Sequence, residues 1–150
     1  MAVWRPPEAI RVKVIGLAWR ESRLLAAEVE TDGGGVKGVR PLGGSIQPGE
    51  TREQALRREF LEELGTEISI SRGWQVFENI YEHEGTLGHE FVFAAEVQLA
   101  DASLYERDEI LFAEDDGTRC RARWFDPAAL RKAGLELYPT GLAEYLTLRV

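Results

Sequence analysis

The pattern of hydrophobic and polar positions divides the chain into short strand-like segments separated by turns. Residues 10–19 alternate at first and then become continuously apolar, and residues 24–30 are apolar again after a short polar turn. Two such segments so close together predict the strands of a β-hairpin. Residues 31–35 carry three consecutive glycines, which do not hold a regular element and so predict a loop. Further strands are predicted over residues 36–42, 68–71, 74–82 and 90–99, with a turn over 83–89, and a second hairpin over 113–125 has Asp116-Gly117 as its turn.

One long helix is marked by residues at both of its ends. Thr51 is a good N-cap, and Gln54 follows it at the position that completes a capping box. Gly65 suits the left-handed conformation that ends many helices. We therefore predict a helix from Arg52 to Leu64.

Two shorter helices are expected near the C-terminal end. Asp126-Pro127 is an N-cap followed by proline, so it starts a short helix that ends near Gly134. A last helix follows Pro139. This order of strands and helices predicts an α/β (α+β) layered domain, in which helices pack on the faces of a mixed β-sheet. At 150 residues, we expect a single domain over residues 1–150.

Composition and charge narrow the classes of partner. The net charge is −8, and no basic footprint of a nucleic-acid duplex binder is visible. The same negative charge argues against an anionic membrane surface, and no apolar run approaches the roughly 20 residues that span a bilayer. We read no signal peptide in the first residues, and the single cysteine, Cys120, fits a reducing compartment. We therefore expect a cytoplasmic protein.

Three glutamates fall on one face of the predicted helix. Glu62 and Glu63 lie three and four residues after Glu59, so the three carboxylates are neighbours although like charges repel. An adjoining stripe of apolar residues is expected to pack on the sheet. Clustered carboxylates are the ligands that Mg²⁺ and Mn²⁺ prefer, whereas the alternative is an ordinary solvated helix face. The apolar stripe consists of Leu56, Phe60, Leu61 and Leu64.

The loop before this helix fits a phosphate ligand. Gly43-Gly44 allows the backbone to approach a ligand closely, because no Cβ intervenes. Glu50 lies just before the N-cap, and Arg58 lies two turns into the helix. An ion pair between them would hold the loop to the helix, mainly to orient it.

The spacing of these residues resembles the signature of the Nudix hydrolases. Gly44 is followed after five residues by Glu50, and after seven more by the run REFLEELG, residues 58–65. All seven fixed identities of the signature are present. Thr66 departs from the pattern, because an apolar residue is usual there, and we expect only a small change in packing. The resemblance implies the Nudix α/β/α sandwich, a mixed sheet between helices.

The resemblance also implies residue roles. Nudix enzymes cleave a nucleoside diphosphate linked to another group by water attack at phosphorus, with Mg²⁺ or Mn²⁺ as the cofactor. By position, Glu62 and Glu63 resemble the principal metal ligands, Glu59 a further ligand or the general base, and the carbonyl of Gly43 an extra ligand. Arg58 and Glu50 resemble the orienting pair. A later carboxylate is the alternative general base, the candidates being Glu90, Glu109 and Glu114.

Substrate identity stays open between several classes. Gly43, Gly44 and Arg40 are candidate substrate contacts, with Arg40 either reaching a phosphate or lying exposed at a strand end. The resemblance implies a nucleoside triphosphate, a dinucleoside polyphosphate or a nucleotide sugar. A nucleotide-sensing module without catalysis is the alternative function. Homodimers are frequent in the family, and an interface around Trp4 and Pro6-Pro7 is a further expectation.

Overall fold

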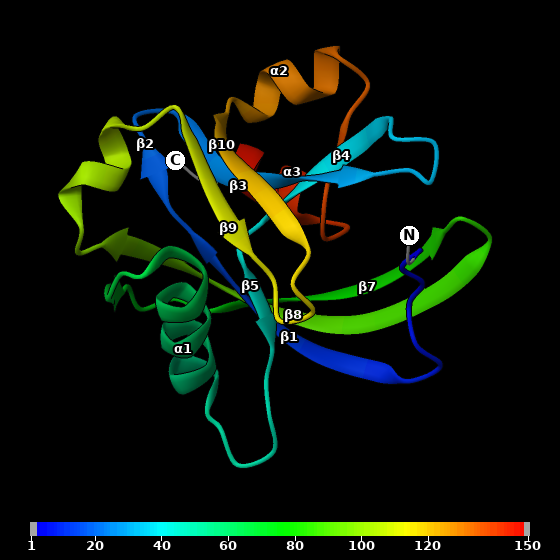
Figure 1. Cartoon of the computed structure of the whole chain (residues 1–150), viewed down its shortest axis with the longest axis horizontal. Helices are drawn as coiled ribbons and strands as arrows, with labels where there is room; N and C mark the ends of the chain where they lie inside the picture. The colour runs from blue at the N-terminus through cyan, green and yellow to red at the C-terminus, as the bar shows by residue number, and fades with distance from the viewer. Residues whose placement is uncertain (1–2, 149–150) are drawn as a thin grey trace.

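The computed structural model describes residues 3–148 and has a mixed α and β architecture (Figure 1). The helix predicted over residues 52–64 is present with those bounds. The longer strands lie close to predicted segments, whereas some strands of two or three residues were not predicted. In chain order the elements are β1 Ile10–Leu17, β2 Trp19–Arg20, β3 Arg23–Glu30, β4 Val36–Pro41, β5 Gly43–Ser45, α1 Arg52–Leu64, β6 Ile68–Ile70, β7 Gln75–His83, β8 Thr86–Leu99, the 3₁₀ helix η1 Ala102–Glu106, β9 Glu109–Ala113, β10 Arg119–Phe125, α2 Pro127–Lys132, β11 Glu136–Leu137 and α3 Leu142–Leu148.

The strands form two sheets among the described residues, where the sequence predicted one mixed sheet. The first has the order β5-β1-β8-β6, with β7 also paired to β8, and its long central pair β1 and β8 is parallel. The second has the order β11-β4-β3-β10-β9, with β2 paired to β3. Parallel and antiparallel pairs occur in both sheets, so the predicted mixed character is confirmed. Their separation depends on contacts between distant strands, which the local pattern does not contain.

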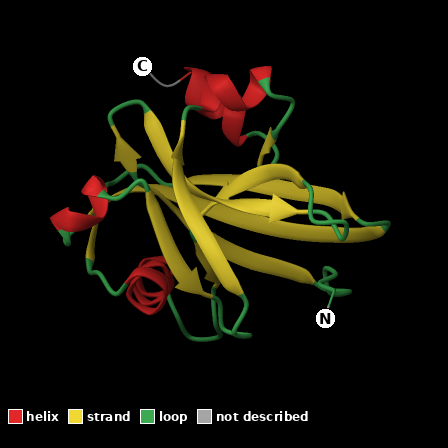
Figure 2. Cartoon of the chain, turned by 45° about the horizontal axis from the view of Figure 1, so that its top comes forward, coloured by secondary structure: helices red, strands yellow, loops and turns green. Residues whose placement is uncertain are grey.

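Helices cover opposite sides of the strands, as the layered prediction requires (Figure 2). On one side, α1 contributes Leu56 and Phe60 to a core that also contains Val14 of β1 and Leu25 of β3. On the other side, Leu130 of α2 and residues of α3 pack against both sheets. Because the side chains of a strand alternate between its two faces, consecutive residues of β1 and β3 serve the two cores in turn.

The termini of α1 have the predicted geometry. The Thr51 side chain accepts a hydrogen bond from the amide of Gln54, whose side chain accepts one from the amide of Thr51. Gly65 ends the helix in the left-handed conformation. The expected apolar stripe is wrong at one position, because Leu61 is 57% exposed, whereas Glu59 is buried. The buried side of the helix is therefore shifted toward the carboxylates.

One predicted turn is shorter than expected. The turn predicted over residues 83–89 is wrong in extent, because β7 runs to His83 and β8 begins at Thr86. Only Glu84 and Gly85 remain between them, and both take positive φ, as a two-residue hairpin turn requires. Farther along the chain, the acidic stretch 101–116 contains η1 and β9, whose residues Leu104, Ile110 and Phe112 are buried.

Thr66, the departure from the signature, is buried in the fold. Its side-chain hydroxyl donates to the carbonyl of Glu67 at 2.8 Å and accepts from the amide of Asp101 at 3.0 Å. A buried hydroxyl needs such partners, and here it joins the end of α1 to the start of η1. Thr66 thus replaces apolar packing by two hydrogen bonds. Among residues 3–148, no helix is long and apolar enough to cross a bilayer.

Candidate active site

Three carboxylates from two distant segments converge beside α1. Oxygen atoms of Glu59, Glu62 and Asp115 all lie within 4.8 Å of one another. Glu59 and Glu62 project from one face of the helix, as their spacing predicts, and Asp115 comes from the turn between β9 and β10. Such a group of oxygen donors suits a hard divalent cation. The sequence did not single out Asp115, although the acidic run at residues 114–116 was a signal that this hairpin could add a carboxylate.

Glu63 is a buried carboxylate without a hydrogen-bond partner among the described residues. Both of its carboxylate oxygens are buried, and neither has a hydrogen-bond partner among the described residues. Burial raises the pKa of Glu63 to about 8, with Glu59 and Glu114 adding to the rise and Arg40 opposing it. Buried carboxylate oxygens are costly unless something pairs with them. The donor set therefore fits a divalent cation, which would supply the missing partner.

The double glycine lets β5 lie against the helix. A Cβ on Gly44 would overlap the carboxylate of Glu59, so only glycine leaves room for that side chain. A Cβ on Gly43 would overlap the carbonyl oxygen of Val14 on β1. Gly44 therefore fits the acidic face of α1 closely, and Gly43 allows β5 to pair with β1.

Arg58 links the loop, β5 and the helix. Its guanidinium donates to both oxygens of Glu50, at 2.7 and 2.9 Å, which confirms the predicted ion pair. It also donates to the carbonyl of Ser45 at 3.0 Å and to Glu59 at 2.8 Å. The hydrogen bond from Arg58, together with one from the amide of Gln47, lowers the pKa of Glu50 to about 2. The bidentate pair with Glu50 fixes the guanidinium of Arg58. The fixed guanidinium in turn holds Glu59, one of the clustered carboxylates, through a hydrogen bond.

Arg40 is paired rather than free at its strand end. It forms an ion pair with Glu114, which lies directly before Asp115 in the β9–β10 turn. Both groups act on Glu63, Arg40 lowering and Glu114 raising its pKa. Cys120 lies near the same groups, and burial followed by the charge of Glu114 raises its pKa to about 11. The cysteine is therefore a half-buried thiol and not an activated nucleophile.

The three later carboxylates considered as general bases lie in different environments. Glu114 is the one that acts on Glu63. Glu109 pairs instead with Arg121 and Arg123 of the neighbouring strand, at 3.5 and 3.3 Å, where all three side chains are exposed. Glu90 is buried on β8, where it accepts hydrogen bonds from other side chains of its sheet.

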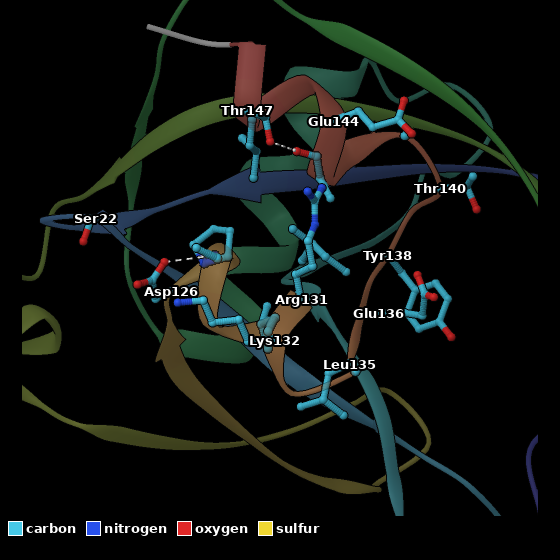
Figure 3. Close-up of a pocket in the computed structure, with 18 of the residues that line it drawn as sticks. Ser22, Asp126, Arg131, Lys132, Leu135, Glu136, Tyr138, Thr140, Glu144 and Thr147 are labelled. Atoms are coloured by element: carbon cyan, nitrogen blue, oxygen red, sulfur yellow. Dashed lines mark hydrogen bonds between the residues drawn. The ribbon is translucent and has the colours of Figure 1, made fainter.

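A cavity lies in another part of the molecule. It has a volume of about 1120 Å³ and lies beside α2 and α3, where Asp126, Arg131, Glu144 and Thr147 are among its lining residues (Figure 3). None of the clustered carboxylates lines it. The chemistry of the carboxylate cluster therefore identifies the candidate active site better than the size of this cavity does.

A match to a family model identifies the family of this chain. The model of the NUDIX domain matches residues 9–145. The chain belongs to the NUDIX family. A curated relative, the oxidized purine nucleoside triphosphate hydrolase of Danio rerio, is 32% identical over 86 residues, which are 57% of this chain and 47% of the relative. The match thus spans about half the length of that relative.

Solved structures share the NUDIX fold with this chain. The E. coli ORF135 protein superimposes with a TM-score of 0.56 at 20% identity, covering 97% of this chain and 96% of that protein. A NUDIX hydrolase from Nitrosomonas europaea gives a TM-score of 0.55 at 22% identity, covering 93% of this chain and 86% of the other. At these identities the likeness concerns the fold, so substrate must be argued from the site.

Proposed function

We propose that the chain is a metal-dependent pyrophosphohydrolase that cleaves a nucleoside diphosphate linked to another group. The observation that carries this proposal is the orphaned Glu63 carboxylate beside the cluster of Glu59, Glu62 and Asp115. A bound Mg²⁺ or Mn²⁺ would offset the repulsion of these carboxylates, attract the diphosphate and make a bound water more acidic. The membership of the chain in the NUDIX family supports the same reaction class.

The protein side chains have distinct roles in this proposal. Glu59, Glu62 and Glu63 hold the cation, with Asp115 and the carbonyl of Gly43 as additional oxygen ligands. Arg58 and Glu50 fix the direction of Glu59, to which Arg58 donates a hydrogen bond. Proton removal from the attacking water falls to Glu59 or Glu114.

Substrate contacts involve Arg40, Gly43 and Gly44. When a phosphate approaches, Arg40 can exchange its partner Glu114 for a phosphate oxygen, because arginine binds both groups with the same planar fork. Gly43 and Gly44 allow the diphosphate to come close to the backbone of β5. Glu114, once released from Arg40, is then available as a base.

Nucleoside triphosphates are the first substrate class to test. The Danio rerio relative is named for oxidized purine nucleoside triphosphates, but its match covers only part of each chain. Dinucleoside polyphosphates and nucleotide sugars contain the same diphosphate linkage. We therefore propose the wider class of nucleoside diphosphate derivatives, with purine triphosphates as its first member to examine.

A hydrolysis screen with product masses tests the reaction. Each class, oxidized purine triphosphates included, would be incubated with Mg²⁺, with Mn²⁺ and with chelator. Metal-dependent cleavage inside the diphosphate is the expected result, and Glu63→Gln should remove it because an amide is a poor ligand for a hard cation. If wild type cleaves none of the classes although it binds the metal, the sensing module without catalysis becomes the better reading.

A further inference from the structure

The first sheet has one face that α1 covers only in part. Gly44 of β5 lies opposite Val14 of β1 and against Glu59, so this is the face on which α1 lies. Figures 1 and 2 show that β1, β7 and β8 extend well beyond the helix. Because alternate residues of a strand share a face, the register places three rows of side chains on it. The rows are Ile10-His89-Ile80, Val12-Phe91-Glu78 and Val14-Phe93-Val76.

Burial along these rows shows where the cover by α1 ends. Val14 is fully buried and belongs to the core that contains Leu56 and Phe60 of α1. Val12, two residues earlier on the same face, is exposed. The solvated face of a half-covered sheet usually carries polar side chains, whereas here most of the outward positions are apolar. These residues form what we call the outer apolar patch: Ile10, Val12, Val76, Ile80 and, two residues before His89 on β8, Leu87.

The outer apolar patch has the size of a binding surface. Its five residues are between 42% and 67% exposed, and the half-buried Phe91 lies among them. These exposures leave on the order of 400 Å² of apolar surface in water, which is as large as the largest apolar patch of a typical monomer. Interfaces are roughly 60% apolar, so a partner centred on the patch would bury about 700 Å² of this chain, close to the roughly 800 Å² per partner of a standard interface.

The two ends of the patch carry opposite charges. Near the β7–β8 turn, Glu82 is exposed on the same face and forms no ion pair with any described residue. At the end beside α1, the guanidinium of Arg52 lies over the rings of Trp74 and Phe93, at 4.7 and 5.4 Å from their centroids. The ion pair of Arg52 with Glu53 is exposed and 3.5 Å long, so it stabilises little. Arg52 can therefore accept a further anionic partner.

A second copy of this chain fits a patch with opposite charges at its ends. A twofold axis perpendicular to the sheet reverses the patch, so the Glu82 end of each copy meets the Arg52 end of the other. Twofold dimers are the commonest oligomers, and they use the same surface of both copies. In the middle of the patch, Glu78 and His89 contact each other at 3.0 Å, so the carboxylate there has a partner within its own copy.

We propose that the outer apolar patch is the interface of a reversible homodimer, in which Glu82 of each copy lies beside Arg52 of the other. This surface differs from the one expected around Trp4, because Trp4 contacts His83 and Arg11, which project to the opposite face of the first sheet. The dimer does not depend on the proposed reaction, since none of the proposed metal ligands belongs to the patch.

Sedimentation equilibrium at several protein concentrations measures the dimer directly. For wild type we expect a Kd on the order of 10 μM, because the interface is at the small end of the specific range and both copies are acidic. Ile80→Lys places a charge inside the interface and should weaken the dimer by about a hundredfold or more. Leu111→Lys is the matched control, because Leu111 is an exposed leucine on β9 of the second sheet, and it should leave the Kd unchanged. Trp4→Ala should also leave the Kd unchanged.

An exchange of charges tests the orientation of the two copies. Glu82→Arg and Arg52→Glu should each weaken the dimer by about tenfold, because each places like charges together at both ends of the interface. The double variant restores opposite charges and should recover most of the wild-type affinity. Circular dichroism of every variant shows whether it is folded, and recovery in the double variant excludes unfolding as the cause of the single effects.

Several results would overturn the proposal. One is a wild type that stays monomeric at concentrations about tenfold above the expected Kd. Another is a dimer that Ile80→Lys leaves intact, and a dimer that only Trp4→Ala weakens would place the interface at the N-terminal segment instead. A double variant that stays as weak as the single variants would exclude the twofold arrangement.

Discussion

In the absence of a metal, burial destabilises the ionised carboxylate of Glu63. Its pKa is raised from 4.5 to about 8, mainly by burial, so the folded chain binds a proton that the unfolded chain releases. Between pH 4.5 and about 8 this difference makes the free energy of unfolding fall as pH rises. In chelator, Glu63→Gln should therefore be more stable than wild type at pH 9 and should lose less stability between pH 5 and 9. Urea unfolding at both pH values measures this, and equal slopes for the two proteins would contradict the burial of an unpaired carboxylate.

We propose that Arg58 affects catalysis by orienting neighbouring groups. Its side chain fixes Glu50, the carbonyl of Ser45 and Glu59 at once, so Arg58→Ala frees a carboxylate of the cluster without removing it. We expect kcat to fall by up to about a hundredfold, because small misplacements of reacting groups are costly. Arg72→Ala, at an exposed loop position, is the matched control and should retain wild-type kcat. Unchanged kinetics in Arg58→Ala would mean that the ion pair with Glu50 is only structural.

Among the elements, the β9–β10 hairpin contributes a carboxylate from a distant part of the chain. Asp115 lies about fifty residues after the glutamates of α1, yet its oxygen joins theirs. Asp115→Asn should weaken Mn²⁺ binding by about tenfold or more. Glu109→Gln, on the same hairpin but paired with exposed arginines, should leave Mn²⁺ binding and kcat unchanged. Titration calorimetry and steady-state kinetics of the two variants test both statements, and equal Mn²⁺ affinities would remove Asp115 from the site.

The helix α1 depends on its first turn for stability. Thr51 and Gln54 satisfy each other's amides in a capping box. Thr51→Ala removes one of these bonds and should lower the free energy of unfolding by about 1 kcal/mol. Thr51→Ser preserves the hydroxyl and should be nearly neutral. A loss of the same size in both variants would assign the effect to packing of the threonine methyl instead of to the cap.

Local signals explain why α1 was predictable and parts of the hairpins were not. The caps Thr51 and Gly65 and the spacing of the glutamates lie within fifteen residues, so the sequence defines both the helix and its acidic face. Glu84-Gly85 is a less common turn sequence than Asn-Gly. Because glycines and histidines surround it, residues 83–89 were predicted as one turn, although β7 and β8 extend into this segment. Asp115 meets Glu59 only because β9 and β10 pack beside α1. Such long-range contacts follow from the whole fold and leave no periodic trace.

At the scale of the whole molecule, the two sheets bring acidic and basic side chains from distant segments to neighbouring places. Gly44 of the first sheet lies against the carboxylate of Glu59, and Arg40 of the second sheet pairs with Glu114 of the β9–β10 turn. The chain carries a net charge of −8, so a polyphosphate would be repelled overall. In our proposal, Arg40 and a bound divalent ion offset this repulsion. The arrangement explains how an acidic protein can take an anionic substrate.

Cation binding should also stabilise the molecule as a whole. A ligand that binds only the folded chain adds about 2.7 kcal/mol at a concentration of 100 Kd, which for 150 residues corresponds to a rise in Tm of about 5–10 °C. Mn²⁺ or Mg²⁺ should therefore raise the Tm of wild type, and chelator should reverse the change. The effect should disappear in Glu63→Gln and persist in Glu109→Gln, because the first variant removes a proposed ligand of the cation and the second changes a carboxylate that is paired with exposed arginines. Thermal unfolding of the three proteins tests this, and a full rise in Glu63→Gln would show that the cation binds elsewhere.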